Sequence, residues 1–428
     1  MKRITFLFSL ILASYILIAQ TKVDDIISVK EVTRIETTLS SNEMLGRAVN
    51  TPGIEKAAQF IAAEFKKAGL QTMEGAKSFR QEFVMVSPKF KNVTATLNGK
   101  ALDDKNVIVI TSQPKVKGSE KDGYLQVRIK DGSNLFREAS NYISAEKNVL
   151  VMVDESFAAS FNRLTGFKRQ LFQSPHHVIF ILSNNDATQW QVEAEHTITE
   201  LPMANIVGMI PGKSKKDEYV IFSAHYDHVG VGKPINGDSI YNGANDDAAG
   251  VTAVIMLANY YKSLANNERT LIFTTFTAEE SGGFGSRYFS TQLNPEKVAA
   301  MFNIEMIGTE SKWGKNSAFI TGYDKTDMGK ILEKNLSGTG FTFHPDPYPD
   351  QQLFYRSDNA TLARLGVPAH TISTAKMEDE PHYHKPSDEI ETLDLDNMTF
   401  IIKSIALSAR SIVSGADSPS RVNTDDLR

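Results

Sequence analysis

The sequence predicts an α/β fold in which a sheet is covered by helices on both faces, giving three layers, with a β-rich domain inserted into it. Two observations predict this fold. In the C-terminal half, short apolar runs alternate with longer amphipathic segments, as strands alternate with helices in α/β proteins. Over residues 85–200, short apolar runs are instead separated by polar turns, which indicates a strand-rich unit. The length of 428 residues also favours two domains over one.

The composition is typical of a globular protein, with 41% apolar and 23% charged residues and a formal net charge of -5. Because no basic stripe or long run of like charge occurs, we expect no nucleic-acid partner. The chain has no cysteine. This excludes a thiol nucleophile, a cysteine-ligated zinc and disulfide bonds.

Residues 1–20 have the pattern of a signal peptide. Lys2 and Arg3 precede an almost wholly apolar run from Ile4 to Ile18, and Ala19 is a small residue suited to cleavage. The alternative is a membrane anchor, but the run is shorter than the roughly 20 apolar residues of a spanning helix. We therefore expect an exported protein, periplasmic or secreted, with no stable membrane span after cleavage.

The elements can be assigned in chain order. A helix is predicted over 54–68, where Ala57, Ile61 and Phe65 recur at helical spacing and Gly69 ends the run. The strand-rich unit contains apolar runs at 107–110, 149–153 and 178–182. Beyond it, we predict strands at 219–224, 270–275, 299–307 and 368–372, and helices at 250–264, 283–289 and 400–413.

These elements divide the chain into three parts beyond the signal peptide. Residues 21–84 and 201–415 are expected to form the main α/β domain, and residues 85–200 the inserted domain. The polar tail at 416–428 is expected to be loose.

Residues of the types that bind metals follow the predicted strands. In open α/β sheets, ligands bind beyond the carboxyl ends of the strands. His225, Asp246, Glu280, Glu305 and His384 all lie in such positions or in the loops between them. Each cluster alone has an ordinary interpretation, such as a helix N-cap for the loop at Asp246. Glu305 is hardest to explain in this way, because it lies in the apolar run MFNIEMI and an unpaired buried charge is very costly.

Taken together, the two imidazoles and three carboxylates form a donor set that suits zinc and similar first-row ions. The set is large enough for two ions that share one bridging carboxylate, an arrangement used in hydrolysis. Competing signatures are absent from the sequence: H-E-x-x-H, the serine elbow G-x-S-x-G and the phosphate loop G-x-x-x-x-G-K-[ST] do not occur.

Four strings in the chain resemble those of a known family, in the same order: HYDHVG at 225–230, GANDDAAG at 243–250, FTAEESGG at 276–283 and YHKPSD at 383–388. The family is that of the co-catalytic zinc exopeptidases, which includes bacterial leucyl aminopeptidases, aminopeptidase Y and glutamate carboxypeptidases. The resemblance covers about residues 30–80 and 200–415. The stretch at 85–200 lies where many members carry a protease-associated domain, and it resembles one weakly.

The resemblance implies a ligand set for two divalent ions, most simply zinc, although cobalt and manganese accept the same donors. His225 and Glu305 would bind the first ion, and Glu280 and His384 would bind the second. Asp246 would bridge them. Many members have Asp in place of Glu305, a departure that the longer side chain can accommodate.

The resemblance implies further roles beside the ligands. Glu279 would be the general base, Tyr383 would donate to the oxyanion, and Asp227 would hold the far nitrogen of His225. The segment RSDN at 356–359 departs from the family, because Asn359 stands where His is common. This leaves the role of Asp358 open.

His228 and His382 are additional histidines close to the expected ligands. We interpret both as supporting or surface groups rather than ligands.

The implied activity is hydrolysis of peptide substrates, with an aminopeptidase as the leading hypothesis. A carboxypeptidase or dipeptidase with the same metal ligands is the alternative, since the ligands do not choose which peptide terminus binds. A non-catalytic receptor-like protein is less favoured, because such members would lack ligands or base. Oligomeric state, side-chain preference and native metal are not determined by these patterns.

Overall fold

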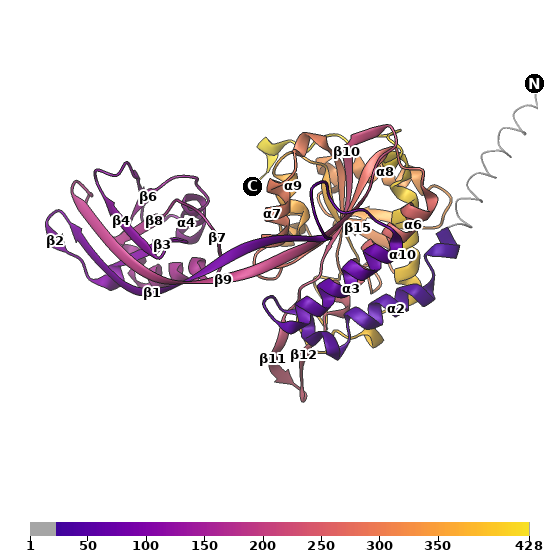
Figure 1. The fold of residues 1–428 in the computed structure, drawn as a ribbon, viewed down its shortest axis with the longest axis horizontal. Helices are drawn as coiled ribbons and strands as arrows, with labels where there is room; N and C mark the ends of the chain where they lie inside the picture. The colour runs from indigo at the N-terminus through magenta and orange to yellow at the C-terminus, as the bar shows by residue number, and fades with distance from the viewer. Residues whose placement is uncertain (1–22, 428) are drawn as a thin grey trace, which may run out of the picture. The chain divides into compact units, whose positions relative to one another are not determined.

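The computed structural model describes residues 23–427 and divides the chain into two compact units (Figure 1). Of the described residues, unit 1 comprises 23–82 and 204–427, and unit 2 comprises Phe83–Met203. Unit 2 is to be compared with the inserted domain that was expected over residues 85–200. The predicted signal peptide at 1–20 lies outside the described residues. No helix within residues 23–427 is long and apolar enough to cross a bilayer.

Unit 1 contains a mixed sheet with helices on both sides. Its helices are α2 (Val29–Leu39), α3 (Pro52–Ala68), α6 (Ala249–Leu264), α7 (Phe284–Thr291), α8 (Met328–Asn335), α9 (Asn359–Ala363), α10 (Leu395–Ser408) and α11 (Arg410–Val413). Its strands are β10 (Lys215–His225), β11 (Gly230–Ile235), β12 (Asp238–Tyr241), β13 (Arg269–Phe276), β14 (Val298–Ile304), β15 (Ser317–Ile320), β16 (Thr342–Pro345) and β17 (Ala369–Ser373). The long strands β1 (Arg80–Leu97) and β9 (Trp190–Ile210) cross the boundary between the units.

The strand order in unit 1 is β16-β15-β17-β14-β10-β13-β9. The four central strands β17, β14, β10 and β13 are parallel to their neighbours within that group, whereas β9 and β15 pair antiparallel to it. The carboxyl ends of the four central strands therefore meet at one edge of the sheet.

The central strands are buried on both faces, as parallel sheets require. Along β10, Val220 and Phe222 contact one apolar cluster, whereas Ile221 between them contacts another. Successive side chains of a strand point to opposite faces, so this alternation places a helical layer on each side. Helices α2, α3, α6, α8 and α10 pack on the first face and α7 and α9 on the second (Figure 1).

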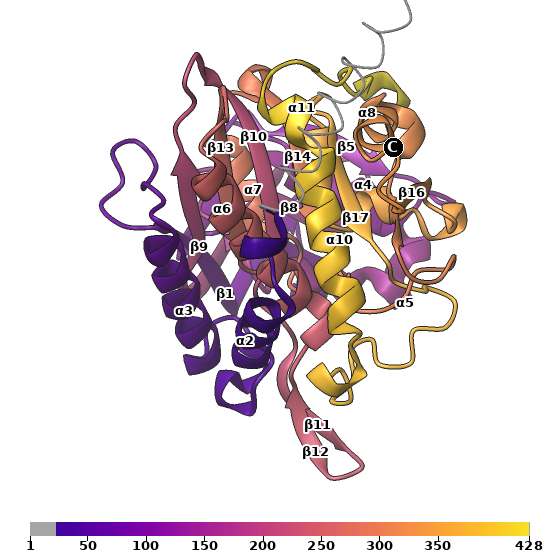
Figure 2. The same cartoon turned by 90° about the vertical axis from the view of Figure 1, so that its right-hand side faces the viewer.

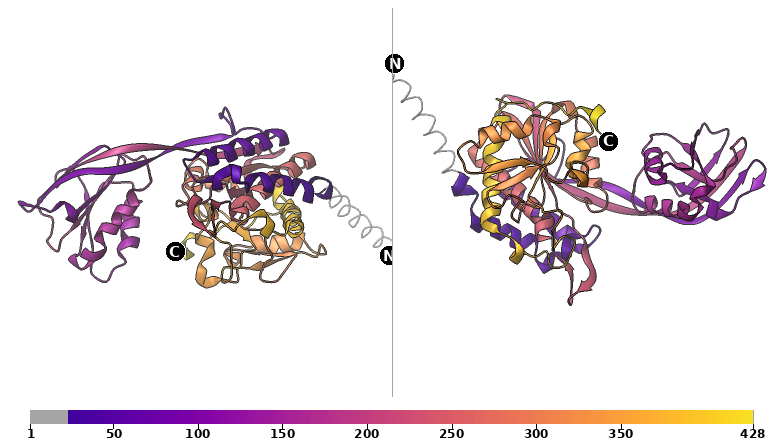
Figure 3. Two further views of the ribbon diagram at one scale, coloured as in Figure 1. Left: turned by 90° about the horizontal axis from the view of Figure 1, so that it is seen from below. Right: turned by 180° about the vertical axis from the view of Figure 1, so that it is seen from behind.

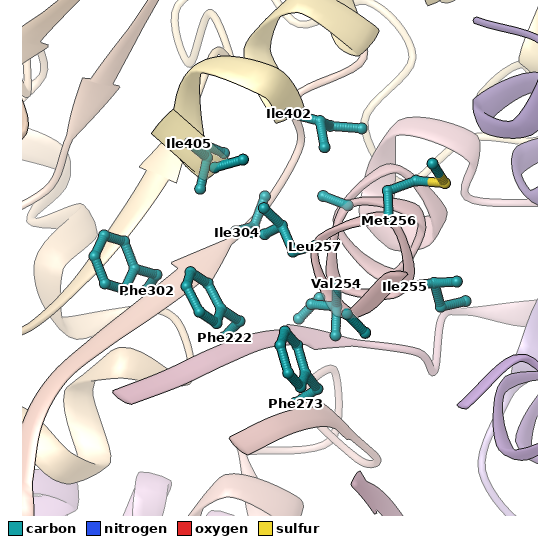
Figure 4. Packing of buried hydrophobic residues seen from close by; sticks show 14 of the residues in the cluster. Phe222, Val254, Ile255, Met256, Leu257, Phe273, Phe302, Ile304, Ile402 and Ile405 are labelled. Carbon is teal, nitrogen blue, oxygen red and sulfur yellow. The ribbon is translucent and has the colours of Figure 1, made fainter. Parts of the chain in front are cut away.

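The centre of the larger cluster is α6, which is buried along almost its whole length. Its neighbours are α2, α3 and α10, which Figures 2 and 3 show in indigo and yellow. Against the sheet, Leu257 and Val254 pack beside stacked phenylalanines from three strands (Figure 4). The ring of Phe222 lies 5.5 Å from that of Phe273 and 5.0 Å from that of Phe302. This rigid core supports the strand ends that carry the polar clusters.

The expectation of a loose tail does not hold for the residues that the structure describes. Arg269 is buried at the start of β13, and its guanidinium donates to the backbone oxygen of Asp417 at 2.8 Å and to Ser418 Oγ at 2.5 Å. Val422 is buried and donates its N–H to Gly366 O at 3.0 Å. The buried guanidinium needs acceptors, and the polar tail supplies them.

Unit 2 is strand-rich but also contains helices. Its remaining elements are β2 (Lys100–Ala101), β3 (Val107–Ile110), β4 (Lys115–Ser119), β5 (Leu125–Ile129), α4 (Leu135–Ile143), β6 (Val149–Val153), α5 (Ala158–Phe161), β7 (Leu171–Phe172) and β8 (Val178–Leu182). A four-stranded sheet has the order β3-β8-β6-β5. Alternate residues of its strands contact two separate apolar clusters, so both of its faces are buried.

A buried acid in α2 gives a prediction about stability. Glu36 Oε2 accepts a hydrogen bond from Thr252 Oγ1 at 2.8 Å, while Oε1 has no hydrogen-bond partner among residues 23–427. Burial raises the pKa of Glu36 from 4.5 to about 8. The folded state therefore holds this proton more tightly than the unfolded chain. The resulting contribution to stability is full below the unfolded pKa and is lost as the pH rises through the folded one.

We therefore expect Glu36→Gln to raise the melting temperature relative to the unmodified chain at about pH 9 and to change it little at about pH 5. Thermal unfolding at both pH values measures the difference. The exposed Glu43→Gln serves as control. Equal effects of Glu36→Gln at the two pH values would contradict the assignment.

Candidate metal centre

The carboxyl ends of the central strands bring the expected site residues to one edge of the sheet. His225 is the last residue of β10, and Glu279 and Glu280 follow the end of β13. Glu305 was expected inside a strand, but β14 ends at Ile304, so Glu305 begins the loop beyond it. This position turns its carboxyl group toward the strand-end cavity described below instead of into the apolar core.

The Asp246 carboxylate lies between two imidazoles. Its Oδ1 is 3.2 Å from His225 Nε2, and its Oδ2 is 3.2 Å from His384 Nε2. The side chain is buried, and the imidazoles around it outweigh the effect of burial and hold the pKa of Asp246 well below its usual range. Asp246 thus presents each of its oxygens to a different histidine, as a bridging ligand would.

Glu280 faces the same cluster from the other side. Its Oε1 is 3.1 Å from His384 Nε2 and 2.9 Å from His228 Nδ1. Ligand atoms of His228, Asp246, Glu280 and His384 all lie within 4.8 Å of one another. His225 and Glu305 are outside this group, although His225 contacts Asp246 directly. The interpretation of His228 as a possible surface group is wrong, because its side chain is buried and hydrogen-bonded to Glu280.

Asp227 forms hydrogen bonds with residues at the ends of two strands, β10 and β13. Its backbone carbonyl lies 3.1 Å from His225 Nδ1, whereas its carboxylate oxygen is 3.9 Å away. The atom that orients His225 is therefore the carbonyl oxygen. The carboxylate instead accepts the backbone N–H groups of Glu279 at 3.0 Å and Glu280 at 3.3 Å. These bonds fix the turn that carries both glutamates.

The loop that carries Asp246 is held by two further carboxylates. Asp388 accepts the backbone N–H groups of Asn245 at 2.8 Å and Asp246 at 3.0 Å. Asp247 accepts from Gly250 N at the start of α6 and from Met306 N beyond β14. The capping interpretation of this loop is thus true of Asp247, while its neighbour Asp246 points into the cluster.

Three residues with left-handed backbone conformation adjoin the site. The φ angles of Ala278, Met306 and His384 are 59°, 53° and 52°. Side chains with a Cβ disfavour this region, and such strain gathers at functional sites. Here the strained residues precede Glu279, follow Glu305 and include His384, so each sets the direction of an expected site residue.

A cavity of about 90 Å³ opens onto Asp246, Glu279, Glu280, Glu305 and Tyr383. Burial, reinforced by the neighbouring carboxylate of Glu305, raises the pKa of Glu279 well above its usual range, although His225 opposes the shift. Burial raises the pKa of Glu305 to about 7. The Tyr383 ring stacks on the His384 ring at 3.9 Å, and burial raises the pKa of this phenol. Tyr383 therefore keeps its proton and can donate it in a hydrogen bond.

These residues fit divalent cations. His225 Nε2, His384 Nε2 and Glu305 Oε2 are buried and form no well-aligned hydrogen bond among residues 23–427. The two imidazole nitrogens instead face carboxylate oxygens of Asp246 and Glu280 at 3.1–3.2 Å, where a cation would lie between donors of both kinds. Buried polar atoms are otherwise almost always satisfied. The carboxylates here also outnumber the imidazoles, and buried negative charge of this density calls for cations. Imidazole and carboxylate donors suit zinc.

Asn359, which stands where His is common in the family, has a structural role. The Asn359 side chain donates to Phe354 O at 3.0 Å and accepts from Thr371 Oγ1 at 2.9 Å, so it ties α9 to β17. Asp358 beside it is buried, and burial raises its pKa to about 6. The partly exposed His382 hydrogen-bonds to Ser387 Oγ at 3.0 Å, in keeping with a supporting or surface group.

One residue that positions the site has no signal in the sequence. Arg47 is buried and donates to the backbone oxygens of Tyr226 at 2.9 Å, Asn242 at 2.6 Å and Gly243 at 2.9 Å. It therefore joins the N-terminal segment to the turn after His225 and to the loop that carries Asp246. Backbone acceptors leave no residue pattern, so only the structure could identify this contact.

The hydrogen bond of His228 leads to a prediction. We expect His228→Phe to weaken metal binding by about 10–100-fold, because groups that orient ligands contribute on this scale. His228→Asn should retain more affinity, since its amide nitrogen can take the place of Nδ1. Competition with a chelator measures the affinity. His382→Asn is the matched control, and equal losses in His228→Phe and the control would refute the role.

The fold and the site define an α/β protein with a metal-ligand cluster at the carboxyl edge of its parallel strands. The model of Peptidase family M28 matches residues 205–408, which include every expected ligand. Over this part, the chain is similar to Peptidase family M28.

Relatives of known name match part of the chain. A probable leucine aminopeptidase of Trichophyton verrucosum is 30% identical over 207 residues, covering 45% of this chain and 53% of that protein. A probable leucine aminopeptidase of Arthroderma benhamiae is 30% identical over 206 residues, with the same coverage of 45% and 53%. The chain thus spans about half the length of the curated relatives it matches.

Solved structures show the same fold over more of the chain. An aminopeptidase from Aneurinibacillus sp. strain AM-1 aligns with a TM-score of 0.55 and 17% identity, covering 96% of this chain and 98% of that one. A zinc aminopeptidase from Bacillus subtilis aligns with a TM-score of 0.54 and 17% identity, covering 93% and 98%. At these identities the likeness concerns the fold, which confirms the predicted α/β class.

Proposed function

We propose that the chain is a metal-dependent aminopeptidase that uses two divalent ions, most simply zinc. The observation that carries this proposal is the Asp246 carboxylate, which lies between His225 and His384 while Glu279 faces the same cavity. The family match and the names of the relatives support it.

The chain offers ligands on both sides of Asp246. His225 and Glu305 would hold one ion, Glu280 and His384 the other, and Asp246 would bridge them. When bound, the ions would polarise the peptide carbonyl and increase the acidity of water. His228 would keep Glu280 in place through the hydrogen bond between Nδ1 and Oε1.

Glu279 is suited to act as the general base. It lines the cavity, and its backbone is fixed by Asp227. Its carboxylate would accept a proton from the attacking water and pass it to the leaving amine. Burial raises the pKa of Glu279, and two divalent cations nearby would lower it. Tyr383 would donate to the substrate carbonyl oxygen as negative charge develops there.

The wall of the cavity supports a preference for apolar side chains. Met306, Phe319, Leu353 and Met377 contribute apolar side chains to this wall. A volume of about 90 Å³ suits a side chain of medium size. We propose that the enzyme releases uncharged apolar residues, such as leucine, from free peptide N-termini.

A carboxypeptidase is the second candidate, because Arg356 also lines the cavity. A guanidinium beside the cluster is suited to bind a C-terminal carboxylate. A panel of substrates separates the two. Leucyl-anilide and leucyl peptides should be hydrolysed, N-acetylated peptides with a free C-terminus should not, and aspartyl-anilide should react poorly. Cleavage of the N-acetylated peptides would overturn the aminopeptidase in favour of the second candidate.

We propose also that the protein is exported, on the strength of the pattern in residues 1–20. N-terminal sequencing of the mature protein tests this. Cleavage near Ala19 is the expected result, and an intact N-terminus on protein retained inside the cell would refute it.

A further inference from the structure

Unit 2 has a basic pocket far along the chain from the metal ligands. Its volume is about 640 Å³, which is within the range of sites for small ligands. Residues of β1, of the turn after β2 and of the helical segment Asn162–Lys168 line it, including Lys89, Lys105, Lys168 and Arg169. Among residues 23–427, the only carboxylate that lines it is that of Asp104. The pocket therefore has an excess of positive charge.

Lys168 is the unusual residue in this pocket. Lys168 is only 8% exposed, and lysines are almost never so buried unless they are paired with an acidic group. Among residues 23–427, no carboxylate lies within ion-pair distance of its Nζ. Its contacts are His196 Nε2 at 3.3 Å and the ring of Phe90 at 5.6 Å. The folded chain thus leaves a buried ammonium without a counter-charge.

His196 does not supply that charge. Burial and the adjacent Lys168 lower the pKa of His196 to about 4, so its imidazole is neutral and Nε2 accepts from the ammonium. Burial lowers the pKa of Lys168 to about 8, which keeps most of it protonated at neutral pH. An anion in the pocket would complete the interaction that the protein alone leaves open.

An aromatic surface adjoins the ammonium. Phe90 also lines the pocket, and it is 47% exposed, which makes it one of the few large apolar side chains exposed in the described residues. A ligand that combines an anionic group with an apolar or aromatic part would cover both residues. Peptides with an acidic residue next to an apolar one have this chemistry, and a peptidase encounters peptides.

We propose that this pocket of unit 2 binds a carboxylate-bearing segment of a peptide, with the carboxylate on Lys168 and the adjacent apolar side chain on Phe90. The site would hold peptide without cleaving it, because the one metal-ligand cluster found among residues 23–427 lies in unit 1. The choice of a peptide as the ligand rests on the proposed peptidase function, whereas the binding experiment below is independent of turnover.

Binding is measured on the full chain carrying Glu279→Gln, so that any hydrolysis is suppressed. The probe is a fluorescein-labelled, N-acetylated peptide in which three glutamates follow a phenylalanine. We expect Lys168→Met to raise its Kd by about tenfold or more, the scale of a hydrogen bond to a charged group. Replacing the glutamates with glutamines should have a similar effect. Lys147→Met, which removes an exposed lysine of the same unit, should leave Kd unchanged.

Thermal unfolding accompanies each titration. Lys168→Met should melt at the same temperature or higher, because it removes an uncompensated buried charge. If it does not fold, Phe90→Ala changes an exposed residue and should weaken binding in its place. Inorganic phosphate is titrated as a competitor to distinguish a peptide carboxylate from a free anion.

Equal affinity for the glutamate and glutamine peptides, or an unchanged Kd in a folded Lys168→Met and in Phe90→Ala, would overturn the proposal. So would binding of phosphate alone with no binding of the acidic peptide. Loss of aminopeptidase activity in the substrate panel with retained peptide binding would refute the proposed function but leave this site standing.

Discussion

Glu279→Gln is expected to lower kcat by about 10²–10⁴-fold while leaving the fold and the bound metal unchanged, because general acid–base catalysis contributes on this scale. The amide has the shape of the carboxylate but cannot accept the proton of the attacking water. KM should change little, since Glu279 is not among the expected ligands. Steady-state kinetics on leucyl-anilide, with metal analysis of the same sample, measure both quantities.

The exposed Glu378→Gln, which replaces a carboxylate outside the cavity, is the matched control and should have unmodified kinetics. Turnover of Glu279→Gln at the unmodified rate would eliminate this residue as the base. A fall in activity that merely followed a loss of metal would assign it to the ligand set instead.

Asp246→Asn is expected to reduce metal binding, unlike Glu279→Gln. Each oxygen of the carboxylate faces a different imidazole, and an amide can replace only one of them. Bound metal should fall from two ions per chain to one or none. Activity should fall by more than about 100-fold, since even groups that only orient ligands contribute 10–100-fold. Elemental analysis of the purified variant, together with kinetics, measures both.

Asp350→Asn removes an exposed carboxylate and should keep both ions. Circular dichroism and thermal unfolding show whether Asp246→Asn is folded, which matters because the replaced group is buried. Two ions and normal turnover in a folded Asp246→Asn would remove the bridging role and with it the two-ion account.

Much of the site was predictable because its residues follow buried strands. The apolar runs at 219–224, 270–275 and 368–372 correspond to β10, β13 and β17, and parallel strands bring their carboxyl ends together. His225 and Glu280 lie near each other for this reason. The limits of strand β14 were less predictable: the run MFNIEMI looks continuous, but the backbone turns left-handed at Met306 and frees Glu305.

Other features depend on contacts that leave no sequence pattern. His228 stands three residues beyond His225, where the alternation of a strand no longer fixes the direction of a side chain. Arg47 acts through backbone oxygens of residues far along the chain. The tail was expected to be loose because its residues are polar. The sequence does not show that Asp417 and Ser418 accept hydrogen bonds from the buried guanidinium of Arg269. The basic pocket of unit 2 likewise forms from segments that are separate in sequence.

The most direct test of the central claim is the metal content of the purified full chain, measured with hydrolysis of leucyl-anilide before and after chelation. We predict two divalent ions per chain, loss of activity as the ions are removed and recovery when zinc is added back. Full activity in metal-free protein would contradict the account. So would a folded chain that binds no divalent ion.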